Sequence, residues 1–249
     1  MLLEINGLTK YYGKDNITKA LDGINLSVEE GDFMGIMGPS GSGKTTLLNL
    51  IATIDVPTSG NVLLEGKDIT QLNAAALSSF RRNRLGIVFQ GFNLVDSLTV
   101  RENIALPMVL NKAGVEAIQA RVAQVAHLLE IEALLDKRPY EISGGEAQRT
   151  AIGRAIVNKP SLLLADEPTG NLDSKNSRAV MQLFSTINAQ EGVTTLMVTH
   201  NPEAASYCKR NIFIRDGKLY NMLQRGDSQK LFFNQILDTL SFLSTNTEL

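Results

Sequence analysis

Four short apolar runs, each bounded by turn residues, stand out in the hydrophobic pattern of the chain. They lie at residues 33–37, 85–89, 161–165 and 194–198. Runs of this length without polar alternation are typical of strands that are buried on both faces, and helical segments separate them along the chain. The pattern therefore predicts an α/β fold in which helices cover a parallel sheet on both sides.

A second kind of strand shows apolar and polar residues in alternation. It occurs in "LLEIN" near the start, in "INLSV" at 24–28 and in "NVLLEG" near Val62, and glycines between these pieces suggest turns. Alternation of this kind predicts a small antiparallel layer with one solvent-facing side. Near the other end, "NIFIRDGKLYNML" predicts a hairpin with its turn at Asp216 and Gly217.

Helical periodicity dominates residues 100–157, for example in "VEAIQARVAQVAHLLEIEALL". This segment interrupts the strand pattern, so we expect a helical lobe inserted in the sheet. The tail at 228–243 is amphipathic and has apolar residues at helical spacing, which are Phe232, Phe233, Ile236, Leu237 and Leu240. Packing of this helix on its own domain is favoured over packing on a partner.

Composition narrows the class of protein. The 24 Lys and Arg residues nearly balance the 26 Asp and Glu residues, so no overall positive field attracts nucleic acid. Cys208 is the only cysteine, which excludes an internal disulfide and suits a reducing compartment. The N-terminus carries Glu4 and no basic region, so we expect no secretory signal. Nothing approaches the apolar length of a membrane-spanning helix, so membrane work would need another chain.

The segment "GPSGSGKT" at 38–45 fits the phosphate-binding loop G-x-x-x-x-G-K-[ST] between a predicted strand and a helix. Glycines allow backbone N–H groups to surround phosphate oxygens, Lys44 supplies positive charge, and Thr45 can ligate Mg²⁺. The alternative is a glycine-rich structural turn. The candidate nucleotide-binding residues here are Gly38, Pro39, Ser40, Gly41, Ser42, Gly43, Lys44, Thr45 and Thr46.

Two adjacent carboxylates follow the buried strand in "SLLLADEPTG". Sheets of this class bind ligands at the carboxyl ends of their strands, where Asp166 and Glu167 stand. Asp166 would hold Mg²⁺, and Glu167 would orient and deprotonate an attacking water. Alone, the pair would be equally compatible with a solvated acidic turn. Beside a phosphate loop, it favours nucleotide hydrolysis.

Two features indicate which class of P-loop hydrolase the chain resembles. The segments "NKAG" and "NKPS" lack the Asp of the Asn-Lys-x-Asp motif by which GTPases recognise guanine. The sequence "ISGGEAQR" is similar to the signature of ATP-binding cassette ATPases, usually written LSGGQ, and the order of phosphate loop, Gln90, signature, Asp166-Glu167, "GNLD" and His200 is that of the family. The chain resembles this family over nearly its whole length.

The resemblance implies roles for four further residues. Tyr12 matches the aromatic residue that stacks on adenine, with Tyr11 as a substitute and an exposed strand-edge tyrosine as the alternative. Gln90 matches the catalytic glutamine that contacts Mg²⁺ and the attacking water and links to the transport partner. Asp173 matches the loop that crosses to the opposite subunit, and His200 matches the switch histidine at the γ-phosphate. His127 receives no role.

Family geometry also implies a head-to-tail dimer of two copies with ATP between them. Ser143, Gly144 and Gly145 would then cap the γ-phosphate held by the other copy's phosphate loop. This sequence departs from the usual signature at Ile142 and at Glu146, where a carboxylate replaces a neutral amide. Because a carboxylate would repel phosphate, we expect Glu146 to point away from the nucleotide.

The resemblance further implies a single domain, 1–249, with a P-loop NTPase (RecA-like) core. Residues 1–90 and 159–225 would form the core with an antiparallel β layer, 91–158 an inserted α-helical lobe that carries the signature, and 226–249 a C-terminal amphipathic helix. Such a cassette is expected in the cytoplasm, bound to the inner face of the cell membrane through a permease.

Three segments, "TIDVPTSGNV", "AASYCKRNIFIRDGKLY" and "KLFFNQIL", resemble the bacitracin and lantibiotic resistance (BceAB) type within the MacB and lipoprotein-release group. That likeness implies two copies on one large permease and a sensor histidine kinase as a further partner. The alternatives are a lipoprotein-release or macrolide-type exporter, a cell-division or signalling cassette, and a cassette acting on nucleic acid or ribosomes. The near-neutral charge and the lack of a long coiled-coil insertion argue against the last.

Overall fold

A six-stranded sheet forms the centre of the computed structural model, which describes residues 1–13 and 16–245. Its order is β10-β9-β3-β8-β7-β6. The strands are β3 (Phe33–Met37), β6 (Leu85–Val88), β7 (Leu162–Asp166), β8 (Thr194–Val198), β9 (Arg210–Arg215) and β10 (Lys218–Gln224). All neighbours are parallel except the hairpin of β9 and β10. The four predicted apolar strands and the hairpin are confirmed to within one residue at each end.

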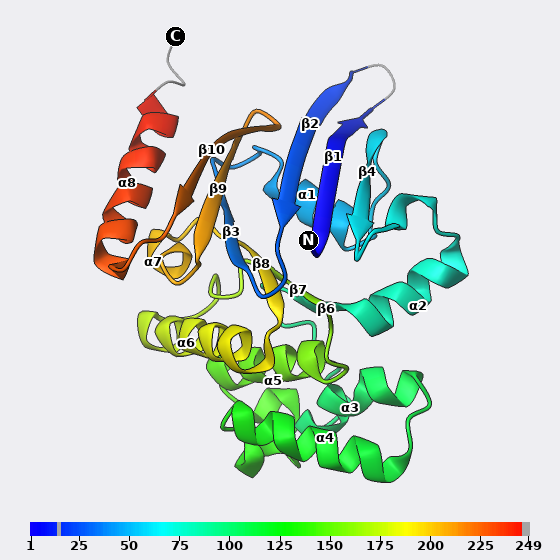
Figure 1. Cartoon of the computed structure of the whole chain (residues 1–249). Helices are drawn as coiled ribbons and strands as arrows, with labels where there is room; N and C mark the ends of the chain where they lie inside the picture. The colour runs from blue at the N-terminus through cyan, green and yellow to red at the C-terminus, as the bar shows by residue number, and fades with distance from the viewer. Residues whose placement is uncertain (14–15, 246–249) are drawn as a thin grey trace.

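An antiparallel sheet of four strands lies beside the first (Figure 1). Its order is β2 (Thr18–Val28), β1 (Leu3–Tyr12), β4 (Ser59–Leu64) and β5 (Lys67–Asp68). The predicted antiparallel layer is confirmed, but the turns expected at its glycines are not all turns. Gly7 and Gly23 have left-handed backbone conformations inside long strands. Gly7 lies at the register shift between Ile5 and Leu8, and Gly23 lies opposite the shift between Leu8 and Lys10, so both mark bulges. β1 and β2 therefore extend beyond the short segments of alternating apolar and polar residues that predicted them.

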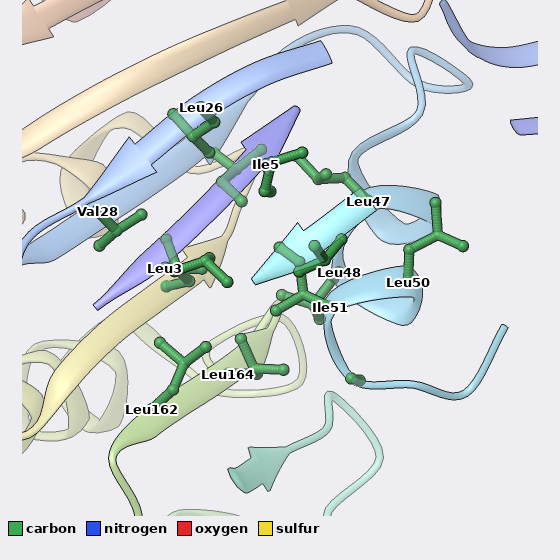
Figure 2. Packing of buried hydrophobic residues seen from close by; sticks show 14 of the residues in the cluster. Leu3, Ile5, Leu26, Val28, Leu47, Leu48, Leu50, Ile51, Leu162 and Leu164 are labelled. Atoms are coloured by element: carbon green, nitrogen blue, oxygen red, sulfur yellow. The ribbon is translucent and has the colours of Figure 1, made fainter. Parts of the chain in front are cut away.

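Helix α1 (Lys44–Ile51) is buried between the two sheets. Figure 2 shows Leu3, Ile5, Leu26 and Val28 of the antiparallel sheet gathered in one cluster with Leu47, Leu48 and Ile51 of α1 and Leu162 and Leu164 of β7. The three α1 side chains are at most 2% exposed. Burial of a leucine or isoleucine contributes about 1.5–3 kcal/mol, so this packing fixes the helix that follows the phosphate loop.

The opposite face of the six-stranded sheet is covered by α5 (Gly144–Ile156) and α6 (Ser174–Glu191). Phe184 of α6 packs on Phe33 with ring centroids 6.3 Å apart. Helices α3 (Val100–Leu110) and α4 (Val115–Leu128) pack on α5 farther from the sheet, in the green part of Figure 1. The helical character predicted for 100–157 is confirmed, although short 3₁₀ turns at Glu132–Leu134 and Pro139–Glu141 interrupt it.

Two shorter elements and the last helix complete the fold. Helix α2 (Ala74–Arg84) precedes β6, after a 3₁₀ turn at Ile69–Gln71, and α7 (Pro202–Ala205) follows β8. Helix α8 (Gln229–Thr245) lies against the end of the sheet at β9 and β10 (Figure 1). Its Phe232, Ile236 and Leu243 are buried with Met37 and Phe213 of the core, which confirms packing on its own domain. Residues 246–249 of the expected C-terminal segment lie outside the described part.

None of the helices in the described residues combines the length and apolar character that a membrane crossing requires. Cys208 is buried in the core, and burial raises the pKa of its thiol far above the ordinary value. A thiol held in the protonated form is a poor nucleophile. Cys208 therefore acts as a small apolar packing residue.

Candidate functional site

The phosphate-loop segment connects the buried strand β3 to the buried helix α1. The connection carries Gly38, Pro39, Ser40, Gly41, Ser42 and Gly43, and α1 begins at Lys44, followed by Thr45 and Thr46. Pro39, Ser40 and Gly41 are exposed to solvent. The helix N-terminus at the end of such a loop leaves backbone N–H groups for an anion. The predicted strand–loop–helix context of the motif is therefore present.

Backbone contacts hold the phosphate loop against both sheets. The Gly217 N–H donates to the Ser42 carbonyl at 3.1 Å, and the Asp22 N–H donates to the Gly217 carbonyl at 2.9 Å. A Cβ atom on Gly43 would lie 2.3 Å from the Ala20 carbonyl oxygen, and one on Gly217 would lie 3.0 Å from the same oxygen. Both glycines have left-handed or related positive φ angles. Strand β2, the loop and the β9–β10 turn therefore meet at a joint that only glycine fits.

Lys44 is folded onto its own loop. Its ammonium donates to the Gly38 carbonyl at 2.9 Å and to the Pro39 carbonyl at 2.8 Å. Burial lowers the pKa of Lys44 below its ordinary value, and the charges of Glu167 and Asp166 oppose the shift. The lysine therefore lies near both carboxylates at the carboxyl ends of β3 and β7.

Asp166 has the features of a cation ligand. Burial raises the pKa of its carboxyl above the ordinary value, the charge of Glu167 adds to the shift, and a hydrogen bond with Thr45 opposes it. Its Oδ1 atom is buried and has no hydrogen-bond partner among the described residues. Mg²⁺ is commonly held by one or two protein oxygens together with phosphates and water. The unpartnered oxygen beside Thr45 therefore fits Mg²⁺ bound with a nucleotide.

Glu167 and His200 form a close pair. The Oε2 atom of Glu167 lies 2.7 Å from Nδ1 of His200, which follows β8. The backbone of Glu167 is left-handed, with φ 50°, and its N–H donates to the Val198 carbonyl at 2.9 Å. Such a conformation costs a non-glycine residue on the order of 1–3 kcal/mol. Strand β8 holds Glu167 in this conformation, with its carboxylate directed to the histidine.

Gln90 lies two residues beyond β6, next to the turn after Glu167. Its side-chain amide donates to Asn171 Oδ1 at 3.4 Å, and the Asn171 amide donates to the Gln90 carbonyl at 3.0 Å. Thus Gln90 contacts Asn171 and is hydrogen-bonded neither to Asp166 nor to Thr45 in the described residues. β6 and β7 are parallel neighbours, so Gln90 and Asp166 both lie at the carboxyl ends of the strands.

Arg154 of α5 holds the segment that follows Gln90. Its guanidinium donates to the Phe92 carbonyl at 2.9 Å and to the Asn93 carbonyl. Phe92 and Asn93 both have left-handed φ angles, 60° and 52°. Burial lowers the pKa of the Arg154 guanidinium below its ordinary value. Hydrogen bonds from a charged donor are the strong kind, so Arg154 offsets the cost of this backbone conformation.

The signature segment begins α5 and is closed by a capping box. Ser143 is the N-cap, and its N–H and hydroxyl donate to Glu146 Oε2 at 2.7 and 2.8 Å. These hydrogen bonds, that from the Ser143 backbone above all, lower the pKa of Glu146 below its ordinary value. The carboxylate therefore lies on the residue that the resemblance assigns to the phosphate. The expectation that Glu146 points away from a nucleotide bound by the other copy stays a prediction.

The start of α5 also packs on the start of α6. A Cβ atom on Gly145 would lie 2.6 Å from the Asn176 side-chain oxygen, and Gly144 faces Leu172. Asp173 is the N-cap of α6 and accepts hydrogen bonds from the Lys175 and Asn176 N–H groups. These bonds, that from Asn176 first, lower the pKa of Asp173 below its ordinary value. The start of α5 thus packs on the residues that flank Asp173, and no hydrogen bond within the described residues joins Ser143–Gly145 or Asp173 to Lys44 or Thr45.

Tyr12 ends β1 and reaches across to the segment after α1. Its hydroxyl donates to Asp55 Oδ2 at 2.6 Å, and the ammonium of Lys10 lies 4.7 Å from the centre of its ring. Burial raises the pKa of Tyr12 above its ordinary value, the hydrogen bond to Asp55 adds to the shift, and a hydrogen bond with Thr46 opposes it. The substitute Tyr11 lies under Lys19, at 5.4 Å. Tyr12 is therefore the tyrosine that adjoins the phosphate-loop helix.

Comparison with known proteins decides the family. The family described as ABC transporter matches residues 21–170 of the chain. The chain belongs to the ABC transporter family. It is similar to the ABC transporter ATP-binding protein YxdL of Bacillus subtilis (strain 168), with 51% identity over 245 residues, 98% of this chain and 95% of that protein.

Two further relatives of this ABC transporter ATPase are informative. The bacitracin export ATP-binding protein BceA of Halalkalibacterium halodurans is 46% identical over 244 residues, 97% of this chain and 96% of that protein. The dimeric structure of MJ0796, a bacterial ABC transporter cassette, has a TM-score of 0.83 and 38% identity and covers 90% of this chain and 100% of that one. A second structure of MJ0796 is a post-hydrolysis state with bound ADP and Pi. The predicted cassette fold is confirmed.

Sequence reasoning missed several residues that shape the site of this ABC cassette. Asn171 contacts Gln90 across 81 positions of sequence, and Asp55 contacts Tyr12 across 43. Arg154 binds Asn93, close to Gln90, across 61 positions. No local pattern marks such contacts. The capping box is different, because Ser143 followed by Glu146 at the third position is a readable helix start.

Proposed function

We propose that this chain binds ATP with Mg²⁺ at residues 38–46 and hydrolyses it by attack of a water on the γ-phosphate. The observation that carries the proposal is the meeting of Lys44, Asp166, Glu167 and His200 at the carboxyl ends of neighbouring strands. An open α/β sheet binds its ligand at the carboxyl ends of its strands.

The roles of Lys44, Asp166 and Glu167 follow from their positions, and those of Gln90 and His200 from the family resemblance. The backbone of the loop and Lys44 bind the phosphates, and Thr45, Asp166 and Gln90 hold Mg²⁺, which when bound neutralises charge on the phosphate oxygens. Glu167 orients the water and takes its proton, while the bond between the γ-phosphorus and the bridging oxygen of ADP breaks. His200 fixes the Glu167 carboxylate through the 2.7 Å contact and faces the γ-phosphate.

We further infer that a second copy completes the site. In the described residues no hydrogen bond joins Ser143–Gly145 or Asp173 to the chain's own Lys44. A phosphate held by the partner is therefore the ligand that we assign to the helix N-terminus at Gly144 and Gly145, and the Ser143 hydroxyl would exchange Glu146 for it. The dimeric structure of the MJ0796 cassette supports this arrangement. ATP would then join two copies head to tail, and hydrolysis would release them.

The transport partner we propose is a membrane permease, which holds two copies at the cytoplasmic face of the membrane. The likeness to a bacitracin export ATP-binding protein supports a role in resistance to antimicrobial peptides, with a sensor histidine kinase acting through the permease. The near balance of 24 basic and 26 acidic residues gives no support for nucleic acid as a partner.

The hydrolysis proposal is tested with Lys44→Ala and Glu167→Gln. We expect both variants to lose Mg²⁺-dependent ATPase activity, because the first loses phosphate charge and the second loses the base. Glu167→Gln should still bind ATP and accumulate as a dimer in light scattering. The matched controls are Lys230→Ala and Glu116→Gln, both at exposed helical positions. Unchanged activity in Lys44→Ala and Glu167→Gln would overturn the assignment.

The transport proposal is tested by purifying the tagged chain from membranes and identifying the protein that accompanies it. A permease with about ten spanning helices and a large extracellular domain, together with bacitracin sensitivity on deletion of the gene, supports the resistance role. A four-helix partner and a division defect would instead favour the cell-division type of cassette.

A further inference from the structure

A closed set of polar contacts surrounds the tyrosine beside the phosphate-loop helix. Asp55 accepts from the Tyr12 hydroxyl through Oδ2 and from the Lys10 ammonium through Oδ1, both at 2.6 Å. The Val56 N–H also donates to Oδ1 at 2.7 Å, and the Val56 carbonyl accepts from Lys10 at 2.7 Å. The Asp55 carboxylate and the Lys10 ammonium thus each have several hydrogen-bond partners. The Tyr12 hydroxyl is bound to the Asp55 carboxylate.

Lys10 is also placed over the tyrosine ring. Its ammonium lies 4.7 Å from the ring centre, within the range of a cation–π contact. The Lys10 side chain is only 12% exposed, whereas Tyr12 as a whole is 42% exposed. One face of the ring is therefore covered by a buried cation, and the exposed part of the tyrosine remains accessible to a ligand.

The same contacts connect the ring to the phosphate-binding helix. Asp55 follows α1, which ends at Ile51, and the segment after it is bound to β1 because the Thr58 N–H donates to the Thr9 carbonyl and the Tyr11 N–H donates to the Thr58 hydroxyl. A hydrogen bond also joins Thr46 of α1 to Tyr12. The position of the ring is thereby fixed relative to the loop that would hold the phosphates.

We propose that Lys10 and Asp55 are positioning residues for nucleotide binding, which hold Tyr12 as a rigid platform open to a purine base on one face only. The inference rests on the proposed ATP site. A tyrosine that is fixed before the ligand arrives loses less conformational freedom on binding, so affinity rises without a new contact to the ligand. We therefore expect Lys10 and Asp55 to strengthen binding of the base and to leave binding of the phosphates unchanged.

The test separates the base from the phosphates. The Kd values of Mg²⁺-ATP and of Mg²⁺-tripolyphosphate, which lacks the base, are measured by calorimetry for the parent, Asp55→Asn, Lys10→Met and Tyr12→Ala. We expect Tyr12→Ala to weaken ATP on the order of tenfold, the scale of one base–aromatic stack. Asp55→Asn should weaken ATP about fivefold and Lys10→Met about threefold, since the ring remains but is less ordered. Tripolyphosphate should bind all four proteins alike.

A double variant and a control complete the design. In the Tyr12→Ala background, Asp55→Asn should have no further effect on ATP, because the platform is already absent. Asp68→Asn is the matched control: Asp68 also accepts side-chain and backbone hydrogen bonds near the antiparallel sheet, but from Thr70 and Asn61. It should change neither Kd.

The outcomes distinguish this inference from the proposed function. If the parent binds both ligands but Asp55→Asn and Lys10→Met bind ATP as tightly as the parent, or lose tripolyphosphate equally, the positioning role is wrong while the ATP site stands. If the parent binds neither ligand, the proposed function fails and the inference fails with it.

Discussion

Replacement of Arg154 by methionine should release the segment that carries Gln90. The guanidinium donates to the carbonyls of Phe92 and Asn93, which are consecutive residues in the left-handed region. That region costs a bulky residue such as Phe92 roughly 1–2 kcal/mol, and an asparagine less. Methionine keeps most of the length of the side chain but cannot donate, so the carbonyls lose their partner and the strained backbone loses its compensation.

The magnitude follows from these contacts. A hydrogen bond from a charged donor contributes about 1.5–3 kcal/mol. Because Arg154 is partly exposed, the lower value applies, and two such bonds give about 3 kcal/mol. Since 1.4 kcal/mol corresponds to about a tenfold change in an equilibrium, opening of residues 90–96 should become about a hundredfold more frequent.

Hydrogen exchange is the direct assay for this prediction. In Arg154→Met, amides of residues 90–96 should exchange about a hundredfold faster, and kcat for ATP hydrolysis should fall while the Kd of ATP stays constant, because the phosphate loop is untouched. Arg82→Met is the control, since Arg82 donates to Ser78 of its own helix. Adding Asn93→Gly should restore part of the protection. Exchange at the parent rate would refute the reasoning.

Three further predictions concern α5 and the helix starts. Glu146→Gln keeps an acceptor for Ser143 but removes a negative charge from the proposed phosphate position, so ATP-dependent dimerisation in sedimentation should tighten by about two- to fivefold, and weaker dimerisation would contradict it. Because the pKa values of Glu146 and Asp173 lie below their ordinary values of 4.5 and 3.8, these carboxylates contribute stability that is present above those values and is lost as the pH falls through the lower folded-state values. The unfolding free energy measured in urea should therefore fall between pH 6 and pH 3, and this fall should be smaller in Asp173→Asn than in the parent. Gly153→Ala should lower the unfolding free energy by about 1–3 kcal/mol in urea titration, because the new Cβ atom would lie 3.0 Å from Leu129; an unchanged midpoint would show that the lobe adapts.

The strands of the central sheet could be predicted because their signal is local. A strand buried on both faces must be apolar throughout, and Leu162, Leu163 and Leu164 meet that requirement without reference to any other part of the chain. The bulges at Gly7 and Gly23 could not be predicted in the same way. A glycine with a left-handed backbone has the same sequence signal in a turn and in a bulge, and only the pairing of β1 with β2 separates the two.

The candidate site likewise contains residues with a local sequence signal and residues without one. Lys44, Asp166 and Glu167 lie in contiguous motifs whose chemistry is readable, whereas Gln90 and His200 gained roles only through the family resemblance. The contact between Glu167 and His200 depends on the adjacency of β7 and β8, which the sequence does not state. Contacts between distant residues, such as Arg154 with Asn93, have no signal in either partner.

The glycine joint at the phosphate loop has a consequence for protein engineering. The atom that excludes a side chain at Gly43 and at Gly217 is the backbone oxygen of Ala20, which belongs to a paired strand and cannot rotate out of the way. Shortening Leu21, whose Cδ2 atom would lie 2.8 Å from a Cβ atom on Gly43, would not make enough room, because the Ala20 oxygen would still lie 2.3 Å away. Redesign of nucleotide preference should therefore begin around Tyr12, where the side chains of Asp55 and Lys10 contact the tyrosine and can be exchanged one at a time.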